Sequence, residues 1–219
     1  MLLSLFIYFF IAFIPYLASY IGLGIAWLDI QKYFQRSILF FVGFGAIKIF
    51  YLAALSPIVE GHVIQSFIVN MLITSFEFIA FYKALCTKSF KGSRVITYFW
   101  ALFTVITNTF FTILSNFRSY EIEINHIIYA FAASQYLFQW GAARNIALGM
   151  DNRYGFFKSK IPVFRQIFIL LLGLPNAFGS LEGISCLPSF IPNVLRIASA
   201  VLLYLFSSLL PRYKAEKKH

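Results

Sequence analysis

The stretch Met1–Tyr20 is MLLSLFIYFFIAFIPYLASY, and it contains no charged side chain. A helix needs about 20 mainly apolar residues to cross the hydrocarbon core of a bilayer. The stretch has neither a cationic leading region nor a small-residue cleavage site, so it differs from a removable signal peptide. We therefore predict that residues 2–22 form a first membrane-spanning helix.

The whole chain shares the composition of this first stretch. Hydrophobic residues make up 60% of the 219 residues and charged residues 12%, whereas a soluble domain has about 25% charged residues. The formal net charge of +10 and the 28 Phe residues are explained by basic loops that orient a membrane protein and by lipid-facing side chains. Sequence-specific nucleic-acid binding and an aromatic ligand cage are therefore not expected. No soluble-length polar stretch interrupts the chain, so residues 1–219 are predicted to be a single polytopic transmembrane domain.

Six further apolar stretches follow the first, separated by Gly, Pro, Asn and charged residues. The fold class predicted is an all-α membrane protein, a bundle of seven transmembrane helices. The predicted ranges are 2–22, 34–55, 63–84, 95–115, 125–145, 161–181 and 190–210.

Basic residues alternate between successive connections, and this alternation predicts the orientation. The N-terminus and the second and sixth connections have no Lys or Arg, and the fourth has Arg118 alone, accompanied by Glu121 and Glu123. The first, third and fifth connections and the C-terminal tail are basic. Cytoplasmic loops retain Lys and Arg, so we predict a lumenal N-terminus and a cytosolic C-terminus.

Three ionisable residues fall inside predicted spans, where charges are costly and are candidates for function. Lys48 lies roughly 13 Å below Pro57 and Glu77 about 25 Å below Glu60 at 1.5 Å per residue, so a direct pair is not expected. We expect Lys48 to face the bundle interior, opposite Asn108 and the fifth helix, and Glu77 to lie near Lys83. Arg196 is expected to reach Glu182. These charges can hold the bundle together, contact partner subunits or line an ion pathway.

Other polar and small residues favour contacts between helices. Gly173 with Ala177, and Gly179 with Gly183, have the four-residue spacing that allows two helix backbones to approach closely. Gln135 and Gln139 lie one turn apart on the fifth predicted helix, where packing within the bundle is their expected role.

Motifs of enzyme chemistry are missing from the sequence. The residues His62, His126 and His219 are scattered, and neither HExxH, GxSxG nor a Gly-rich phosphate loop occurs. We expect neither catalysis nor a bound cofactor or metal. A transporter or small ion channel that uses Lys48, Glu77 and Arg196 stays open as an alternative, although no internal repeat is visible. A seven-helix receptor is a third possibility, and only the predicted number of helices favours it.

Two sequence blocks resemble one family. The first is FIAFIPYLASY, with Pro15, Tyr16 and Tyr20, and the second is Lys48-Ile49-Phe50-Tyr51-Leu52-Ala53, followed by Pro57 and Glu60-Gly61. Together they resemble the transmembrane protein 147 family, which is similar to the seven-helix scaffold of gamma-secretase. Weaker similarities continue at Glu77, Lys91-Gly92, Arg118 and Arg196.

The resemblance implies a non-enzymatic scaffold in the endoplasmic reticulum membrane. Members of that family join nicalin and NOMO in the BOS complex, which lies behind the Sec translocon of a bound ribosome and assists insertion of multispanning proteins. The expected partners are therefore nicalin-like and NOMO-like membrane proteins, with the translocon and the ribosome as larger neighbours. We also expect Pro57 and Glu60-Gly61 to form a tight lumenal turn.

Overall fold

The computed structural model describes residues 2–23, 27–59, 63–85, 90–110, 124–150, 162–183, 187–188 and 190–209. Within these ranges every regular element is helical and no strand occurs. The α-helices are α1 Leu2–Leu23, α2 Trp27–Val59, α3 Val63–Leu85, α4 Phe90–Val105, α6 Ile124–Ala132, α7 Gln135–Met150, α8 Pro162–Leu171, α9 Leu174–Phe178 and α10 Phe190–Ser208. A π-helical segment, η1 Ile106–Phe110, follows α4, and a 3-10 segment, η3 Gly179–Gly183, follows α9.

Four of the described helical stretches are long and apolar enough to cross a membrane: Ser4–Gly22, Ile30–Tyr51, Val63–Leu85 and Phe190–Ser208. A shorter apolar stretch covers Gln166–Glu182. Large apolar side chains are exposed along them, including Ile21 at 72% and Phe50 at 80%. Apolar surface of this extent suits the interior of a bilayer rather than water. The expected membrane character is thus supported, with an all-helical fold.

Helix α1 packs through a stripe with helical spacing. Ser4, Tyr8, Ala12 and Tyr16 are buried at every fourth position, whereas Phe10 on the other face is 56% exposed. Side chains four residues apart lie one above the other on a helix, so this spacing directs one face toward the bundle. The sequence-predicted range of 2–22 agrees with the observed Leu2–Leu23.

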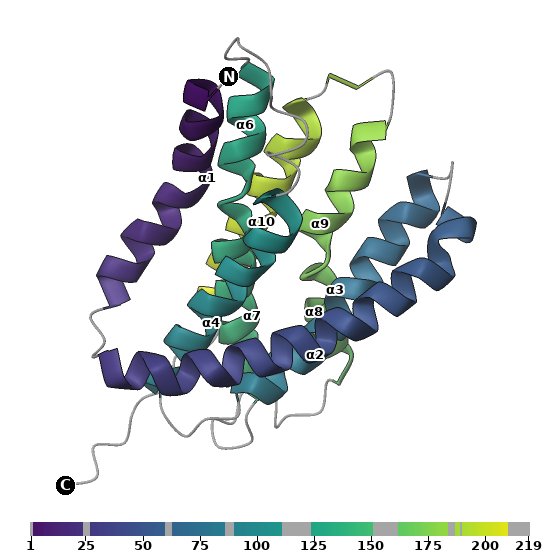
Figure 1. The fold of residues 1–219 in the computed structure, drawn as a ribbon. Coiled ribbons are helices and arrows are strands. Elements are labelled where there is room, and N and C mark those ends of the chain that lie inside the picture. The colour runs from purple at the N-terminus through teal and green to yellow at the C-terminus, as the bar shows by residue number, and fades with distance from the viewer. Residues whose placement is uncertain are drawn as a thin grey trace, which may run out of the picture.

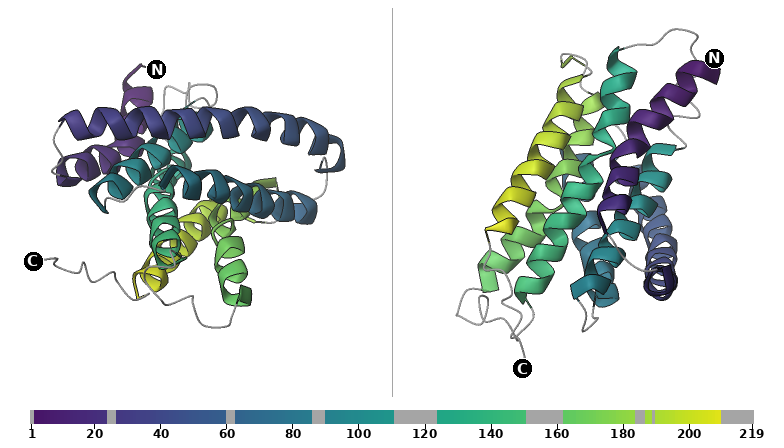
Figure 2. Two further views of the ribbon diagram at one scale, coloured as in Figure 1. Left: turned by 90° about the horizontal axis from the view of Figure 1, so that it is seen from below. Right: turned by 90° about the vertical axis from the view of Figure 1, so that its left-hand side faces the viewer.

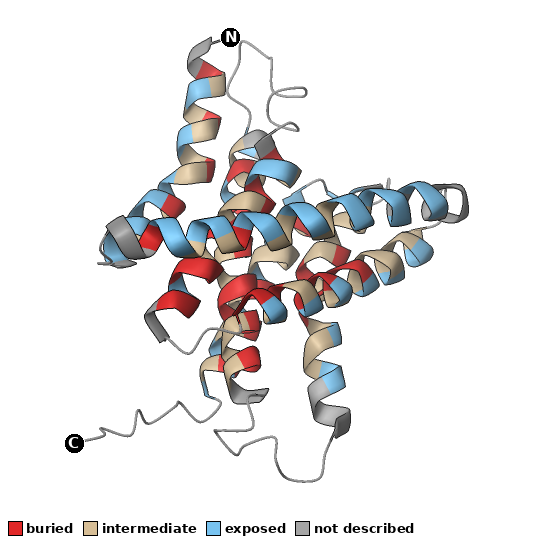
Figure 3. Ribbon diagram, turned by 60° about the horizontal axis from the view of Figure 1, so that its bottom comes forward, coloured by how far each residue is buried: buried red, intermediate tan, exposed pale blue. Residues whose placement is uncertain are grey.

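Helix α2 is longer than predicted and lies on the outside of the bundle. Its 33 residues span Trp27–Val59, about 50 Å at 1.5 Å per residue, where the sequence predicted 34–55. Figure 1 shows α2 crossing the lower part of the bundle, and Figure 3 shows that much of its length is exposed. Its first half packs on α4, where the Phe34 and Phe99 ring centroids are 5.0 Å apart. Its second half runs beside α3, as the left panel of Figure 2 shows.

The core lies where α3, α4 and α7 meet. Phe81, Trp100 and Trp140 come from these three helices, and each is at most 2% exposed. The Phe81 centroid lies 5.4 Å from that of Trp100 and 4.9 Å from that of Trp140. Ala142 and Ala143 of α7 are buried with them, and small residues of this kind let helices approach closely.

Two predicted helices are broken in the structure. The range 125–145 divides into α6 and α7 at Ala133–Ser134, and the range 161–181 divides into α8 and α9 at Leu172–Gly173. Pro175 follows the second break, and it lacks the N–H that would bond the carbonyl of Leu171 in a continuous helix. Apolar composition alone does not reveal either break, because both flanking segments are apolar.

Some predicted features lie on residues outside the described ranges. Pro57 belongs to the last turns of α2, but Glu60 and Gly61 fall in the gap between α2 and α3, so the expected turn is not tested. Residues 111–123, with Arg118 and the two glutamates, and the tail from residue 210 are likewise outside the described part of the chain.

Candidate functional site

The phenol of Tyr16 joins the first helix to the break between α6 and α7. Tyr16 is 1% exposed, and its hydroxyl donates a 2.8 Å hydrogen bond to the carbonyl of Ala133. At the break, the Leu137 N–H bonds to the Ser134 carbonyl rather than four residues back. The Ala133 carbonyl accepts only a longer 3.4 Å bond from the Tyr136 N–H, so its second lone pair is open to another donor. A residue of the first motif block supplies that donor.

The neighbours of Tyr16 in the motif have simpler surroundings. Pro15 lies inside α1, which continues through it. Tyr20 is 37% exposed, and its ring centroid lies 5.8 Å from that of Tyr98 on α4. The motif therefore contributes one buried hydrogen bond and one ring contact, both of which position α1 against the bundle.

Lys48 and Glu77 form an ion pair, and the expectation that they would not meet is wrong. The ammonium of Lys48 lies 3.9 Å from Glu77 Oε2. The other carboxylate oxygen accepts a 3.1 Å hydrogen bond from Trp100 Nε1. Glu77 is 4% exposed at its side chain and Lys48 28%. The carboxylate is thus buried in the core, while the lysine approaches it from the outer helix α2.

The expectation failed because both heights were counted from the wrong residues. Helix α2 continues to Val59 and α3 begins at Val63. Counted from these ends, Lys48 lies about 16 Å and Glu77 about 21 Å along their helices. The long lysine side chain spans the remaining difference. The expected neighbour Asn108 instead donates a 3.3 Å hydrogen bond to the hydroxyl of Tyr136.

Arg196 is the centre of a second polar group, and its predicted contact with Glu182 is confirmed. The distance from Arg196 Nη1 to Glu182 Oε1 is 3.2 Å. Arg196 Nε also donates to Gln135 Oε1 at 3.2 Å, and Nη1 lies 3.4 Å from Asn193 Oδ1. The guanidinium, 14% exposed, therefore links α10 to α7 and to η3.

The hydrogen bonds continue from Gln135 to α3. Gln135 Nε2 donates to Asn176 Oδ1 at 3.4 Å, and Asn176 Nδ2 donates to Thr74 Oγ1 at 2.9 Å. Beside them, Asn70 Nδ2 donates to the Ser180 hydroxyl at 2.8 Å. We refer to the connected side chains Asn70, Thr74, Gln135, Asn176, Ser180, Glu182, Asn193 and Arg196 as the polar network.

Gln139 has the same role at the second helix break that Tyr16 has at the first. Its side chain is buried, and Nε2 donates a 2.7 Å hydrogen bond to the carbonyl of Leu172. The expected packing role of Gln135 and Gln139 within the bundle is therefore confirmed. Gly173, beside this break, packs directly on α3: a Cβ atom there would lie 2.5 Å from Met71 Cα. The close approach that the Gly173–Ala177 spacing predicted is thus present.

Several residues of these polar contacts were not predicted from the sequence. Trp100, the donor to Glu77, is one of three Trp residues and carries no motif. Asn176 and Thr74 are polar residues inside apolar stretches, a signal that marks interhelical hydrogen bonds in membrane helices. The sequence could therefore have predicted that Asn176 and Thr74 form interhelical hydrogen bonds. It could not have predicted that they bond to each other, because they are 102 positions apart.

The arrangement is suited to holding helices together. Most of the side-chain contacts described above join different helices, and an interhelical hydrogen bond in a membrane contributes on average about 0.6 kcal/mol. In the described part of the chain, no group of three or more His, Cys, Asp or Glu residues is placed to hold a metal ion. Comparison with known proteins found no matching family model, no matching curated protein and no matching solved structure.

Proposed function

We propose that this chain is a non-enzymatic scaffold subunit of a translocon-associated complex in the endoplasmic reticulum membrane. Its bundle holds a nicalin-like and a NOMO-like membrane protein beside the Sec translocon. These partners are the ones that the resemblance to the transmembrane protein 147 family implies. The complex assists insertion of multispanning membrane proteins.

One observation supports a scaffold most directly. The ionisable residues singled out within the spans, Lys48, Glu77 and Arg196, have acceptors or counter-ions inside the bundle itself. Charges paired in this way stabilise a fixed arrangement of helices. A fixed arrangement is what a scaffold needs in order to present lipid-facing surface to other membrane proteins.

The proposal includes seven spans with a lumenal N-terminus. Each of the seven sequence-predicted ranges overlaps helical structure in the described residues, and basic residues favour the cytosolic side. An N-glycosylation acceptor placed on a polar N-terminal extension should be modified in endoplasmic reticulum membranes, and the same acceptor on a C-terminal extension should not. Modification of the C-terminal acceptor alone would contradict the orientation.

A small ion channel or transporter is the second candidate, because Lys48 of the outer helix α2 forms a charged pair with Glu77, whose carboxylate is buried in the core. Liposomes that contain the purified chain distinguish the two functions. A scaffold gives ion flux no greater than empty liposomes. Flux that disappears on Lys48→Met or Glu77→Gln, with Gly45→Ala unchanged, would favour the channel.

Affinity purification tests the scaffold itself. The tagged chain, extracted from native membranes in a gentle detergent, should recover a nicalin-like protein and translocon subunits, identified by mass spectrometry. A tagged membrane protein of similar size and unrelated sequence is the control. Failure to recover these partners with a folded chain would count against the proposal.

A further inference from the structure

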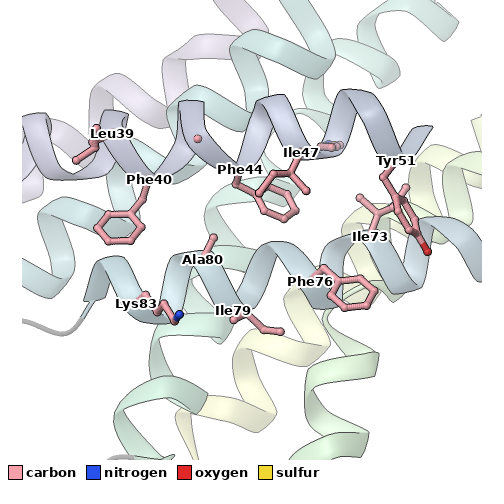
Figure 4. Close-up of a pocket in the computed structure, with 12 residues that line it drawn as sticks. Leu39, Phe40, Phe44, Ile47, Tyr51, Ile73, Phe76, Ile79, Ala80 and Lys83 are labelled. Atoms are coloured by element: carbon pink, nitrogen blue, oxygen red, sulfur yellow. The ribbon is translucent and has the colours of Figure 1, made fainter. Parts of the chain in front are cut away.

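A groove lies between α2 and α3, and apart from Lys48 its lining takes no part in the polar contacts described above. Its volume is about 620 Å³, within the range of roughly 300–1,000 Å³ that small-ligand sites occupy. Figure 4 shows its walls, with α2 on one side and α3 on the other. We refer to it as the α2–α3 groove. The residues that line it are Leu39, Phe40, Gly43, Phe44, Ile47, Lys48 and Tyr51 of α2, and Ile73, Phe76, Ile79, Ala80 and Lys83 of α3.

The groove is apolar along its length and differs at its two ends. Tyr51 and Phe76 lie together at one end, with ring centroids 6.2 Å apart. Lys83 lies at the other end (Figure 4). From Ile73 to Lys83 the groove extends about 15 Å along α3. These features fit a narrow apolar chain that ends in a polar group beside Lys83.

The polar end carries positive charge. Arg36 Nη2 donates a 3.1 Å hydrogen bond to the carbonyl of Lys83, and its guanidinium carbon lies 5.9 Å from the centre of the Phe40 ring, which lines the groove. Two cationic side chains thus lie at this end. The nearby charges Lys48 and Glu77 are paired with each other.

We propose that the α2–α3 groove binds an anionic glycerophospholipid, with an acyl chain between the two helices and the phosphate beside Lys83 and Arg36. Basic pockets between membrane helices recognise anionic headgroups in this way. The volume favours a lipid over a protein helix, because a helix about 10 Å wide would fill roughly 1,200 Å³ over the same 15 Å. The site is independent of the proposed scaffold function, since it requires only this chain and a bilayer.

Two glycines of α2 provide a matched pair of variants for the apolar part. A Cβ atom at Gly43 or at Gly45 would meet nothing within 4 Å, but only Gly43 lines the groove. Gly43→Leu should therefore narrow the groove, because its Cβ enters open space, and Gly45→Leu should leave it open. Thermal unfolding in detergent should be similar for both variants.

The probe is a phosphatidylserine with a photoactivatable group in its acyl chain, present as a minor component of phosphatidylcholine vesicles that contain the purified full-length chain. Irradiation followed by peptide mass spectrometry should place adducts on groove residues such as Phe44 and Phe76. Gly43→Leu should reduce these adducts to background, and Gly45→Leu should retain them. Adducts spread evenly over the outer helix faces, or equal yields from both variants, would overturn the proposal.

The charge at the polar end has its own test. Lys83→Gln should reduce the preference for photoactivatable phosphatidylserine over the matching phosphatidylcholine probe by about fivefold, since a basic residue near the surface contributes about 1 kcal/mol. Lys32→Gln removes an equal charge from an exposed position on α2 that does not line the groove, and it should change the preference little. An unchanged preference in Lys83→Gln would contradict headgroup recognition.

A protein in the groove is the remaining alternative to a lipid. Photocrosslinking in native membranes distinguishes the two. A photoreactive amino acid at Ile47, which lines the groove and is 65% exposed, should yield adducts of lipid mass. A discrete adduct with another protein as the main product would overturn lipid binding at this site.

Discussion

Tyr16 illustrates how one hydroxyl group can fix the position of a whole helix. Its hydrogen bond reaches the Ala133 carbonyl, 117 residues along the chain. The bond is buried, so no water competes for either partner. The role of Tyr16 within the FIAFIPYLASY block is therefore structural: it ties α1 to the place where the fifth predicted span breaks.

Removing this hydroxyl should lower stability without changing shape. We expect Tyr16→Phe to reduce the free energy of unfolding in detergent by about 1 kcal/mol, the usual contribution of one hydrogen bond. Tyr20→Phe is the control, because Tyr20 is 37% exposed and the change keeps its ring against Tyr98. Equal midpoints of thermal unfolding for the two variants would contradict the role given to the Tyr16 hydroxyl.

Lys48 and Glu77 should behave as a coupled pair. Lys48→Met leaves the buried carboxylate without its cation, and Glu77→Gln leaves the ammonium without its anion. The destabilisations caused by the two single changes are expected to add up to more than the destabilisation caused by the double change. The double-mutant cycle should give a coupling free energy of about 0.5–3 kcal/mol. Additive effects would show that the 3.9 Å separation contributes nothing.

At the scale of the helices, close packing between two backbones fixes how the elements are arranged. Gly173 lies at the break between α8 and α9, against the backbone of α3 at Met71. Because backbone atoms cannot move aside as a flexible side chain can, any side chain at this position forces the two elements apart.

We therefore expect Gly173→Ala to destabilise the protein by about 1–3 kcal/mol, the range for overpacking. Gly45→Ala is the matched control, since a Cβ at Gly45 meets nothing within 4 Å. Unfolding of both variants in the same detergent provides the comparison. A Gly173→Ala protein as stable as Gly45→Ala would show that α8–α9 can shift away from α3 at no cost.

Sequence predicted the apolar helices well but their interruptions poorly. The range 2–22 matches α1, and 63–84 matches α3. A long apolar run with few charges is expected to form a membrane-spanning helix. The break at Ala133–Ser134 was missed, since the backbone there bonds to Tyr16 on another helix and no local sequence pattern gives that contact. The length of α2 was missed as well, because the helix already includes Ile30, which packs on Val95 and Phe99 of α4, where a loop was expected.

The candidate site was predictable in part for the same reason. Arg196 and Glu182 lie near opposite ends of one short connection, so the sequence could pair them. Lys48 and Glu77 required the true ends of α2 and α3, which no local pattern gave. Trp100, which completes the contacts of Glu77, comes from a third helix and depends on tertiary packing.

At the scale of the whole molecule, the interior combines an apolar core with buried polar contacts, and large apolar side chains cover much of the outside. The polar network joins α3, α7, α9, η3 and α10, whereas the outer faces of α1 and α2 are exposed (Figure 3) and carry large apolar side chains. A bundle of this kind has a fixed interior and a broad surface for lipid and for other membrane proteins. We infer that this outer surface is where a scaffold would contact its partners.

Quantitative affinity purification from gently solubilised endoplasmic reticulum membranes tests the scaffold claim most directly. A nicalin-like protein should be recovered in nearly equal amount to the tagged chain, together with a NOMO-like protein and translocon subunits. An unrelated tagged membrane protein should recover none of them. Recovery of the chain alone, folded and monodisperse in the same detergent, would contradict it.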